Sequence, residues 1–370
     1  MEVFRPYSFD KPLFLVVLGL LGAGLVMVFS SSAVLAAEAY NSSFYFIIQQ
    51  GIGAGLGLLF ILFILSIRKA FYQNPLFIFG LLLSSFFLLV LCLTMPTFSG
   101  ANRWIYFFGI SFQPSELAKI SLILFFAFYI DKKKELIQNV KNFLLPMGIL
   151  FLFILLIIKE PDYGTALLVF IICSIMLFIG GFRLSYFLSL AILSIITFGF
   201  YLIQAEYRIE RILAFLSPTE DPLGRGFQVI QSKLAVGAGG LLGVSIGESV
   251  QKLYFLPCAH TDYIFAIIGE ELGLLGTMGI LTLFILFLWR GLVISLRAPN
   301  SFSQLLAAGL TLAVFVQAVF NISIVLGLAP PTGLPLPFIS YGRSSLVMTL
   351  FAVGILLHIS QRRTNLKEKA

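Results

Sequence analysis

The chain is dominated by about ten apolar runs of roughly 17–25 residues, each long enough to cross a bilayer as a helix. Charged residues make up only 11% of its 370 residues, whereas soluble domains carry roughly 25%. A transmembrane β-barrel would instead show short segments of alternating polarity. The sequence therefore predicts an all-α integral membrane protein in which residues 1–370 form a single polytopic domain.

The distribution of positive charge predicts the orientation of these helices. With both termini cytoplasmic, most of the 24 basic residues fall in segments on the inner side, as the positive-inside rule requires. The same residues are scattered rather than gathered in a stripe, so we expect no nucleic-acid partner. The expected spans are 12–34, 44–66, 75–95, 114–130, 143–159, 164–181, 184–204, 263–289, 302–327 and 344–360.

One connection is unusually long, because about 58 residues, 205–262, separate the seventh and eighth expected helices. Loops of this length are usually functional. The spacing of apolar residues over 209–216 predicts a helix lying on the outer leaflet. Glycines between 237 and 247 suit either a close backbone approach or a re-entrant segment. We therefore expect a large extracytoplasmic loop between helices 7 and 8.

The stretch "HTDYIFAIIGEELG" places several ionisable groups at the start of the eighth expected helix. Asp262 is a candidate general base at the outer boundary of the membrane, although Thr261 or Asp262 could equally cap the helix. His260 is either a polar loop residue or a group that orients Asp262 or meets a phosphate. Glu270 and Glu271 lie two to three turns deeper, which favours a structural role as hydrogen-bond partners.

The segment "NRWIYFFGISFQPSELAK" combines two further groups of candidates. Arg103 and Trp104 are either an interfacial anchor or a phosphate clamp beside a surface for a sugar or lipid. Glu116 and Lys119 have the i, i+3 spacing of an ion pair on one helix face. Ionisable residues inside a membrane usually pair in the bundle interior and mark functional sites.

Three other outward segments contribute candidates for substrate binding. In "EPDYGTA", Asp162 either closes a solvated turn or, with Glu160, holds a cation or an acceptor hydroxyl. Lys252 in "SVQKLYFLP" belongs to the outer basic set, whose members most often contact lipid headgroups. Ser340 lies in the stiff, proline-rich loop "LAPPTGLPLPFISYGRSS", which suits a wall lining a cavity.

No nucleotide-binding, serine-hydrolase or zinc motif is present in the sequence. Any chemistry must then use an activated substrate that reaches the outer face. The three cysteines show no metal-ligand or disulfide spacing. We expect no cofactor and no resident metal, although the sequence leaves open whether a divalent cation takes part.

Several motifs together resemble the SEDS family (shape, elongation, division and sporulation), and the resemblance covers nearly the whole chain. The motifs are "GLVMVFSSS", "NRWI…FQPSELAKI", "EPDYGTA", "DPLGRGFQVIQS", "GLLGVSIGESVQKLYFLPCAHTDYIFAIIGEELG" and "GLPLPFISYGRSS". "GLVMV", "VGAGGLLGVSIG" and "SVQKLYFLP" look like its division branch (FtsW and SpoVE), whereas "PPTGLPLP" leans toward the elongation branch (RodA).

The resemblance implies a peptidoglycan glycosyltransferase of the bacterial cytoplasmic membrane that polymerises lipid II at the outer face. Asp262 would be its general base, and Arg103, Lys119 and Lys252 would be candidates for binding the diphosphate. Implied partners are the nascent glycan strand, a class B penicillin-binding protein and other division proteins. Alternative roles are a lipid II flippase, a non-catalytic scaffold, or elongation instead of division.

Two positions depart from the family pattern. The family commonly carries glutamate where this chain has Cys258, and a glycine where it has Arg343. Neither departure removes the expected base.

Overall fold

The computed structural model describes residues 9–67, 70–95, 103–107, 110–133, 139–183, 185–186, 213, 215–222, 224, 226–253 and 255–367. The helices in this part are α1 (Lys11–Tyr40), α2 (Tyr45–Ser66), η1 (Phe71–Gln73), α3 (Pro75–Thr94), α4 (Pro114–Lys132), α5 (Val140–Lys159), α6 (Tyr163–Ile179), α9 (Phe227–Ala238), α10 (Ile264–Leu296), α11 (Ser301–Val325) and α12 (Arg343–Lys367).

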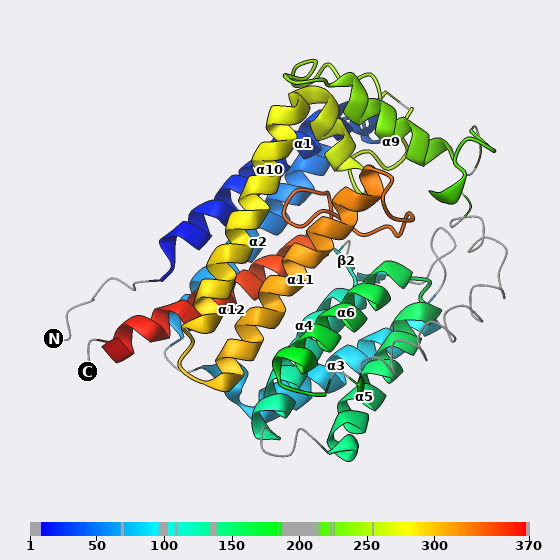
Figure 1. Ribbon diagram of the computed structural model, residues 1–370. Coiled ribbons are helices and arrows are strands. Elements are labelled where there is room, and N and C mark those ends of the chain that lie inside the picture. Colours follow the sequence, from blue (N-terminus) through cyan, green and yellow to red (C-terminus); the bar gives the residue numbers. More distant parts are fainter. Residues whose placement is uncertain are drawn as a thin grey trace.

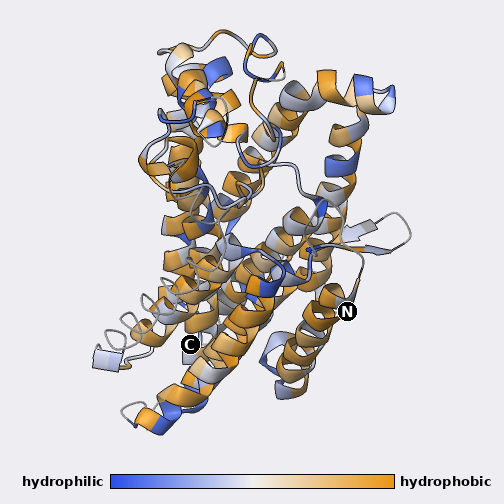
Figure 2. Cartoon of the chain, turned by 90° about the vertical axis from the view of Figure 1, so that its right-hand side faces the viewer, coloured by the Kyte–Doolittle hydropathy of each residue, from blue (hydrophilic) through white to orange (hydrophobic). Residues whose placement is uncertain are grey.

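The predicted all-α membrane fold is confirmed. Nine of the ten expected spans coincide with a helix, and the seventh, 184–204, lies almost entirely outside the described residues. Among those residues, seven helices are long and apolar enough to cross a membrane: α1, α2, α3, α5, α10, α11 and α12. Of the other two that match expected spans, α4 carries four charged residues and α6 is only 17 residues long. In Figure 2 the long helices are mostly hydrophobic.

The first and last helices meet at one end of the bundle, which we call the terminal end (Figure 1). There the backbone N–H of Asp10 donates to Oγ of Ser360 over 3.0 Å, and Arg290 pairs with the Asp10 carboxylate at 2.5 Å. Because Arg290 belongs to the second half of α10, the start of that helix points to the opposite end. That opposite end, which carries Asp262, is called the site end.

A pair of strands and one helix were not predicted from the sequence. Strands β1 (Ile105–Phe107) and β2 (Ile110–Phe112) form a small antiparallel ribbon directly before α4, with Tyr106 opposite Ser111. Helix α9 lies inside the long loop 205–262, and turns follow it up to α10. The surface helix expected over 209–216 falls mainly on residues outside the described part.

Helix α10 is interrupted at Gly273, where the backbone adopts φ 63° and ψ −160°. The groups that the interruption frees bond to the glycine-rich segment 239–245. Val244 N–H donates to the Glu270 carbonyl over 3.0 Å, and Leu274 N–H donates to the Gly240 carbonyl over 2.9 Å. A polar backbone group left unpaired at membrane depth costs several kcal/mol. The glycine-rich segment therefore completes the broken helix, and the expected close backbone approach is confirmed.

Replacing Gly273 with alanine is expected to destabilise the fold by about 3 kcal/mol or more, because this region of φ and ψ is essentially restricted to glycine. The new Cβ would also lie 2.4 Å from the Gly243 nitrogen. Gly279→Ala is the matched control, since it lies in the same helix and its Cβ would meet nothing within 4 Å. Thermal unfolding in detergent measures both variants, and equal melting temperatures would contradict this account of the break.

Candidate functional site

Asp262 lies half-buried in the turn that leads into α10. The N-cap position of α10 is occupied by Tyr263, whose side chain makes no capping hydrogen bond, so neither Thr261 nor Asp262 is the N-cap residue. Two side chains from other segments hold the turn by its backbone. Oγ of Ser340 donates to the Thr261 carbonyl, and Nδ2 of Asn321 donates to the Asp262 carbonyl over 2.7 Å. The turn is thus held in place from outside its own segment.

The proline-rich loop between α11 and α12 forms one wall beside Asp262. Ser340 closes the loop on itself by accepting a hydrogen bond from Leu336 N–H at 2.8 Å, and its carbonyl accepts one from Gln50 of α2 at 2.9 Å. At the loop's apex Gly333 adopts φ 78°. A Cβ there would lie 3.5 Å from Oδ2 of Asp262 and 3.8 Å from Nη1 of Arg103. Carboxylate and guanidinium therefore border the same small space beside Gly333.

Arg103 reaches this space from the segment before β1. Its Nε donates to the Glu160 carbonyl over 3.2 Å, and its Nη2 donates to the Pro161 carbonyl. These bonds fix the guanidinium to the turn between α5 and α6 while Nη1 faces Gly333. Trp104 follows it, half-buried, at the start of the ribbon. The substrate-binding roles predicted for both residues remain predictions.

Asp162 is buried and organises the start of α6. Its Oδ1 accepts a hydrogen bond from Thr165 N–H at 3.2 Å, which makes Asp162 the N-cap of that helix. Its Oδ2 accepts hydrogen bonds from Gln113 at 3.0 Å and Ser115 at 3.2 Å. A carboxylate with three donors within the fold holds the chain before α4 against α6. This places Asp162 next to the candidate site as a structural support.

The neighbouring carboxyl, Glu160, is completely buried in the same turn. Its pKa is raised from the usual 4.5 to about 9, first by burial and then by the Asp162 charge, while a hydrogen bond with Cys92 and the charge of Arg103 oppose the rise. Glu160 is consequently a neutral acid at pH 7.

Stability is expected to fall as pH rises from about 5 to 9, because the folded chain keeps the Glu160 proton in a range where the unfolded chain has lost it. Glu160→Gln should abolish this loss, so its advantage in melting temperature over the wild type should grow with pH. Thermal unfolding between pH 5 and pH 9 measures the difference. A difference that stays constant across this range would show that Glu160 ionises normally in the fold.

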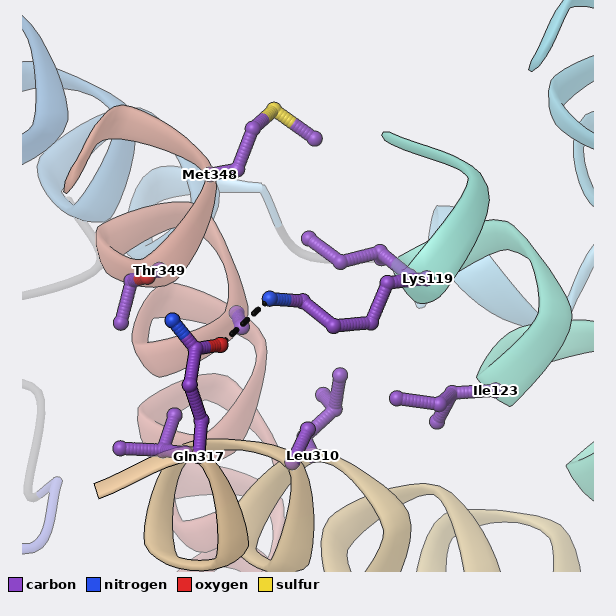
Figure 3. Close-up of a pocket in the computed structure, with 10 residues that line it drawn as sticks. Lys119, Ile123, Leu310, Gln317, Met348 and Thr349 are labelled. Atoms are coloured by element: carbon purple, nitrogen blue, oxygen red, sulfur yellow. Dashed lines mark hydrogen bonds between the residues drawn. The ribbon is translucent and has the colours of Figure 1, made fainter. Parts of the chain in front are cut away.

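The predicted pair on α4 is confirmed. Glu116 and Lys119 form a buried ion pair at 2.8 Å, and Nζ of Lys119 also donates to Oε1 of Gln317 on α11 over 2.8 Å (Figure 3). Beside them lies a cavity of about 10 Å³, which is room for roughly one water molecule. The pair is buried among the helices, and its hydrogen bond to Gln317 connects it to α11, which also contacts the Asp262 turn.

Lys252 lies in a separate cluster. Its ammonium is 2.7 Å from Glu271 and 3.2 Å from Oγ of Ser30 on α1. Glu270 accepts hydrogen bonds from Ser249 and from the backbone N–H of Val250 at 3.0 Å. The structural role predicted for the two glutamates is confirmed. The structure places Lys252 in a buried ion pair, so its role as a ligand for an outer diphosphate remains a prediction without geometric support.

His260 packs against the rings of Phe46 and Tyr341, with centroid distances of 4.8 and 5.8 Å, and those two rings also contact each other. Burial lowers its pKa, so the ring is neutral near pH 7. Cys258, exposed on the same turn, adopts φ 57°. Although the residue is exposed overall, partial desolvation by neighbouring groups and then the charge of Asp262 raise the pKa of Cys258. His260 thus holds the turn through ring packing. The pKa of the Cys258 thiol depends on the nearby Asp262 charge.

Sequence reasoning missed the residues that support the site from α11 and α2. Gln317 and Asn321 lie at i, i+4 and are both fully buried, and Gln50 is buried on α2. Amide side chains inside apolar runs were the available signal, because polar groups in a membrane helix usually face partners. Among the described residues, no group of three or more His, Cys, Asp or Glu side chains could hold a metal ion.

The arrangement at the site end combines one carboxylate, held by its backbone, with a guanidinium that faces the same space. A carboxylate can accept a proton from a hydroxyl, and a guanidinium can bind a phosphate or diphosphate. Together these two groups suit the transfer of a group from a phosphate-linked donor to an alcohol acceptor.

Comparison with known proteins adds independent information. A family model described as "Cell cycle protein", FTSW_RODA_SPOVE, matches residues 11–365. A probable peptidoglycan glycosyltransferase FtsW of Geobacter metallireducens is 42% identical over 96% of this chain and 95% of its own length. Stage V sporulation protein E of Bacillus subtilis is 41% identical over 95% of this chain and 97% of its own.

The fold comparison agrees with these relatives. A chain from a structure described as "Structural coordination of polymerization and crosslinking by a peptidoglycan synthase complex" superposes with a TM-score of 0.79. It is 29% identical, and the match covers 96% of this chain and 98% of that one. The protein therefore belongs to the FtsW, RodA and SpoVE family of cell cycle proteins.

Proposed function

We propose that this protein is a peptidoglycan glycosyltransferase of the division branch, which polymerises lipid II at the outer face of the bacterial cytoplasmic membrane. The observation that carries the proposal is the convergence of Asp262 and Arg103 on the space beside Gly333. It is supported by relatives named FtsW and SpoVE, which match nearly the whole chain at 41–42% identity. The site end would face outward, with the termini and their basic residues in the cytoplasm.

Asp262 would act as the general base on the acceptor. Its carboxylate takes the proton of the GlcNAc 4-hydroxyl of an incoming lipid II, and the oxygen attacks C1 of the MurNAc at the end of the growing chain. The bond between C1 and the diphosphate oxygen breaks, and undecaprenyl pyrophosphate leaves with both bonding electrons. Attack from the opposite face inverts the configuration and gives a β-1,4 linkage.

Arg103 is the best-placed candidate to stabilise the leaving diphosphate, because Nη1 faces the same space as Asp262. Lys119 and Lys252 are each engaged in a buried ion pair. A diphosphate is already a good leaving group, so one base and one cation suffice for this chemistry. No step requires a cofactor, and a divalent cation would be an addition to this scheme.

The partner would be a class B penicillin-binding protein, which crosslinks the strands that this chain makes. The structural neighbour, described as a peptidoglycan synthase complex that coordinates polymerisation and crosslinking, supports this assignment. Other division proteins would recruit the pair.

The deciding experiment mixes the purified protein and its transpeptidase partner with lipid II in detergent. The expected product is a ladder of glycan strands that a muramidase digests. A second arm measures translocation of labelled lipid II across liposomes that contain the protein. Translocation without polymer would favour the flippase alternative, and neither activity would favour the scaffold.

A further inference from the structure

Two amides on one face of α11, Gln317 and Asn321, connect the base to the ion pair of α4. The Asn321 amide nitrogen donates to two backbone carbonyls, that of Asp262 at 2.7 Å and that of Leu334 at 2.8 Å. These carbonyls belong to two segments that meet at the candidate site. A single side chain therefore fixes the turn of the base relative to the opposite wall.

Gln317 repeats the arrangement one turn deeper. Its Nε2 donates to the Pro335 carbonyl over 2.9 Å, and its Oε1 accepts a hydrogen bond from Lys119 over 2.8 Å. Successive carbonyls of the proline-rich loop, those of Leu334 and Pro335, thus bond to successive amides of α11. Gly333, the residue immediately before Leu334 in this loop, borders Asp262 and Arg103.

We infer that Asn321 is a positioning residue for Asp262, and that Gln317 extends the same rigid frame to the buried Glu116–Lys119 pair. The inference rests on the proposed function in assigning catalysis to Asp262. In this frame α11 sets the position of the Asp262 turn relative to the loop that carries Gly333. The ion pair of α4 then serves the reaction through Gln317 and not through contact with substrate.

The physical argument is that the two amide side chains that donate these hydrogen bonds are buried. Asn321 is 0% exposed and Gln317 is 1% exposed, so water cannot replace a lost amide N–H. A buried carbonyl that loses its donor must move to find another. Displacement of a catalytic group by about 1 Å can cost roughly 100-fold in rate.

Cys258 supplies a direct reporter of this positioning. Its thiol is exposed on the turn that ends at Asp262, whereas Cys92 and Cys173 are buried. The Cys258 carbonyl accepts hydrogen bonds from Thr261 N–H at 3.1 Å and Tyr263 N–H at 3.4 Å, so the thiol and the base share one turn. Loosening that turn would raise the rate at which a maleimide labels Cys258.

The test uses the full-length protein with Asn321→Leu, which removes the donors at similar volume, and Asn321→Asp, which replaces the amide nitrogen with oxygen. Both should lose about 100-fold in kcat for lipid II polymerisation with little change in KM. Both should also label faster at Cys258. The matched control is Thr311→Val on the same helix, because Thr311 is equally buried and, among the described residues, its hydroxyl donates to the Ala307 carbonyl of α11 itself.

The labelling comparison needs no enzyme activity, so it tests the positioning even if the wild type fails to polymerise lipid II. Faster labelling in both Asn321 variants and not in Thr311→Val supports the inference. Wild-type labelling rates, or full polymerisation by either Asn321 variant, would overturn it. A variant that unfolds is recognised by its melting temperature, and the other Asn321 variant then decides.

Discussion

Asp262→Asn is expected to reduce lipid II polymerisation by about 10²–10⁴-fold, the range that a general base contributes. Asparagine has nearly the same shape, so the turn and its hydrogen bonds to Ser340 and Asn321, which run through backbone carbonyls, should persist. What the variant loses is the ability to accept the proton of the acceptor hydroxyl. The loss should appear in kcat, with KM for lipid II nearly unchanged.

Asp221→Asn is the matched control for this experiment. It makes the same chemical change within the long loop, at an exposed residue whose Oδ1 accepts a hydrogen bond from Gly224 N–H at 3.0 Å. Asparagine can accept the same bond, so full activity is expected. Polymerisation by Asp262→Asn at a rate comparable to the control would remove Asp262 from the mechanism while leaving the family assignment intact.

Lys252→Met is expected to cost about 3–5 kcal/mol of stability, because it leaves the Glu271 carboxylate buried without its cation. The side chains of Lys252 and Glu271 are only 7% and 0% exposed. Ser30 donates to the carboxylate over 2.7 Å, but a hydroxyl does not neutralise a buried charge. Thermal unfolding in detergent, together with the yield of folded protein, measures the loss.

Two comparisons separate the ion pair from packing. Removing both charges in Lys252→Met with Glu271→Leu should recover most of the stability, since apolar replacements of a buried pair are often neutral or stabilising. Lys159→Met removes a lysine from the exposed end of α5 and should change stability by no more than about 0.5 kcal/mol. If the double variant were less stable than Lys252→Met alone, burial of the unpaired charge would not be the cause.

The membrane-spanning architecture was predictable because a bilayer imposes about twenty apolar residues on each helix. Nine expected spans are helices that begin within three residues of the predicted start, although α1, α10 and α12 extend six or seven residues beyond the predicted end. The Glu116–Lys119 pair was equally readable, since both members lie on one helix three positions apart. Both predictions depended only on patterns within a single helix: the length of an apolar run and the spacing of two charged residues.

Contacts between distant segments were not predictable in the same way. Lys252 was expected to face the outside, yet its partners come from α1 and α10, and no spacing rule identifies them. The break at Gly273 was hidden as well, because Gly276 and Gly279 follow it in an otherwise continuous apolar helix. The role of Asn321 depends on two loops meeting at its side chain. In each case the role of the residue is determined by contacts between segments that are distant in the chain, and one sequence does not reveal those contacts.

The interruption at Gly273 divides α10 into a part that can span the membrane and a shorter part that leads to the candidate site. Residues 274–296 alone extend about 34 Å at 1.5 Å per residue, which is enough to cross a hydrocarbon core of about 30 Å. The nine residues from Ile264 to Leu272 are then not needed for spanning, and the loop segment 239–245 holds them. A thinner bilayer would increase the tilt of residues 274–296, and a thicker one would reduce it. The position of Asp262 relative to Arg103 would be set by protein contacts, so catalysis would tolerate changes in lipid composition.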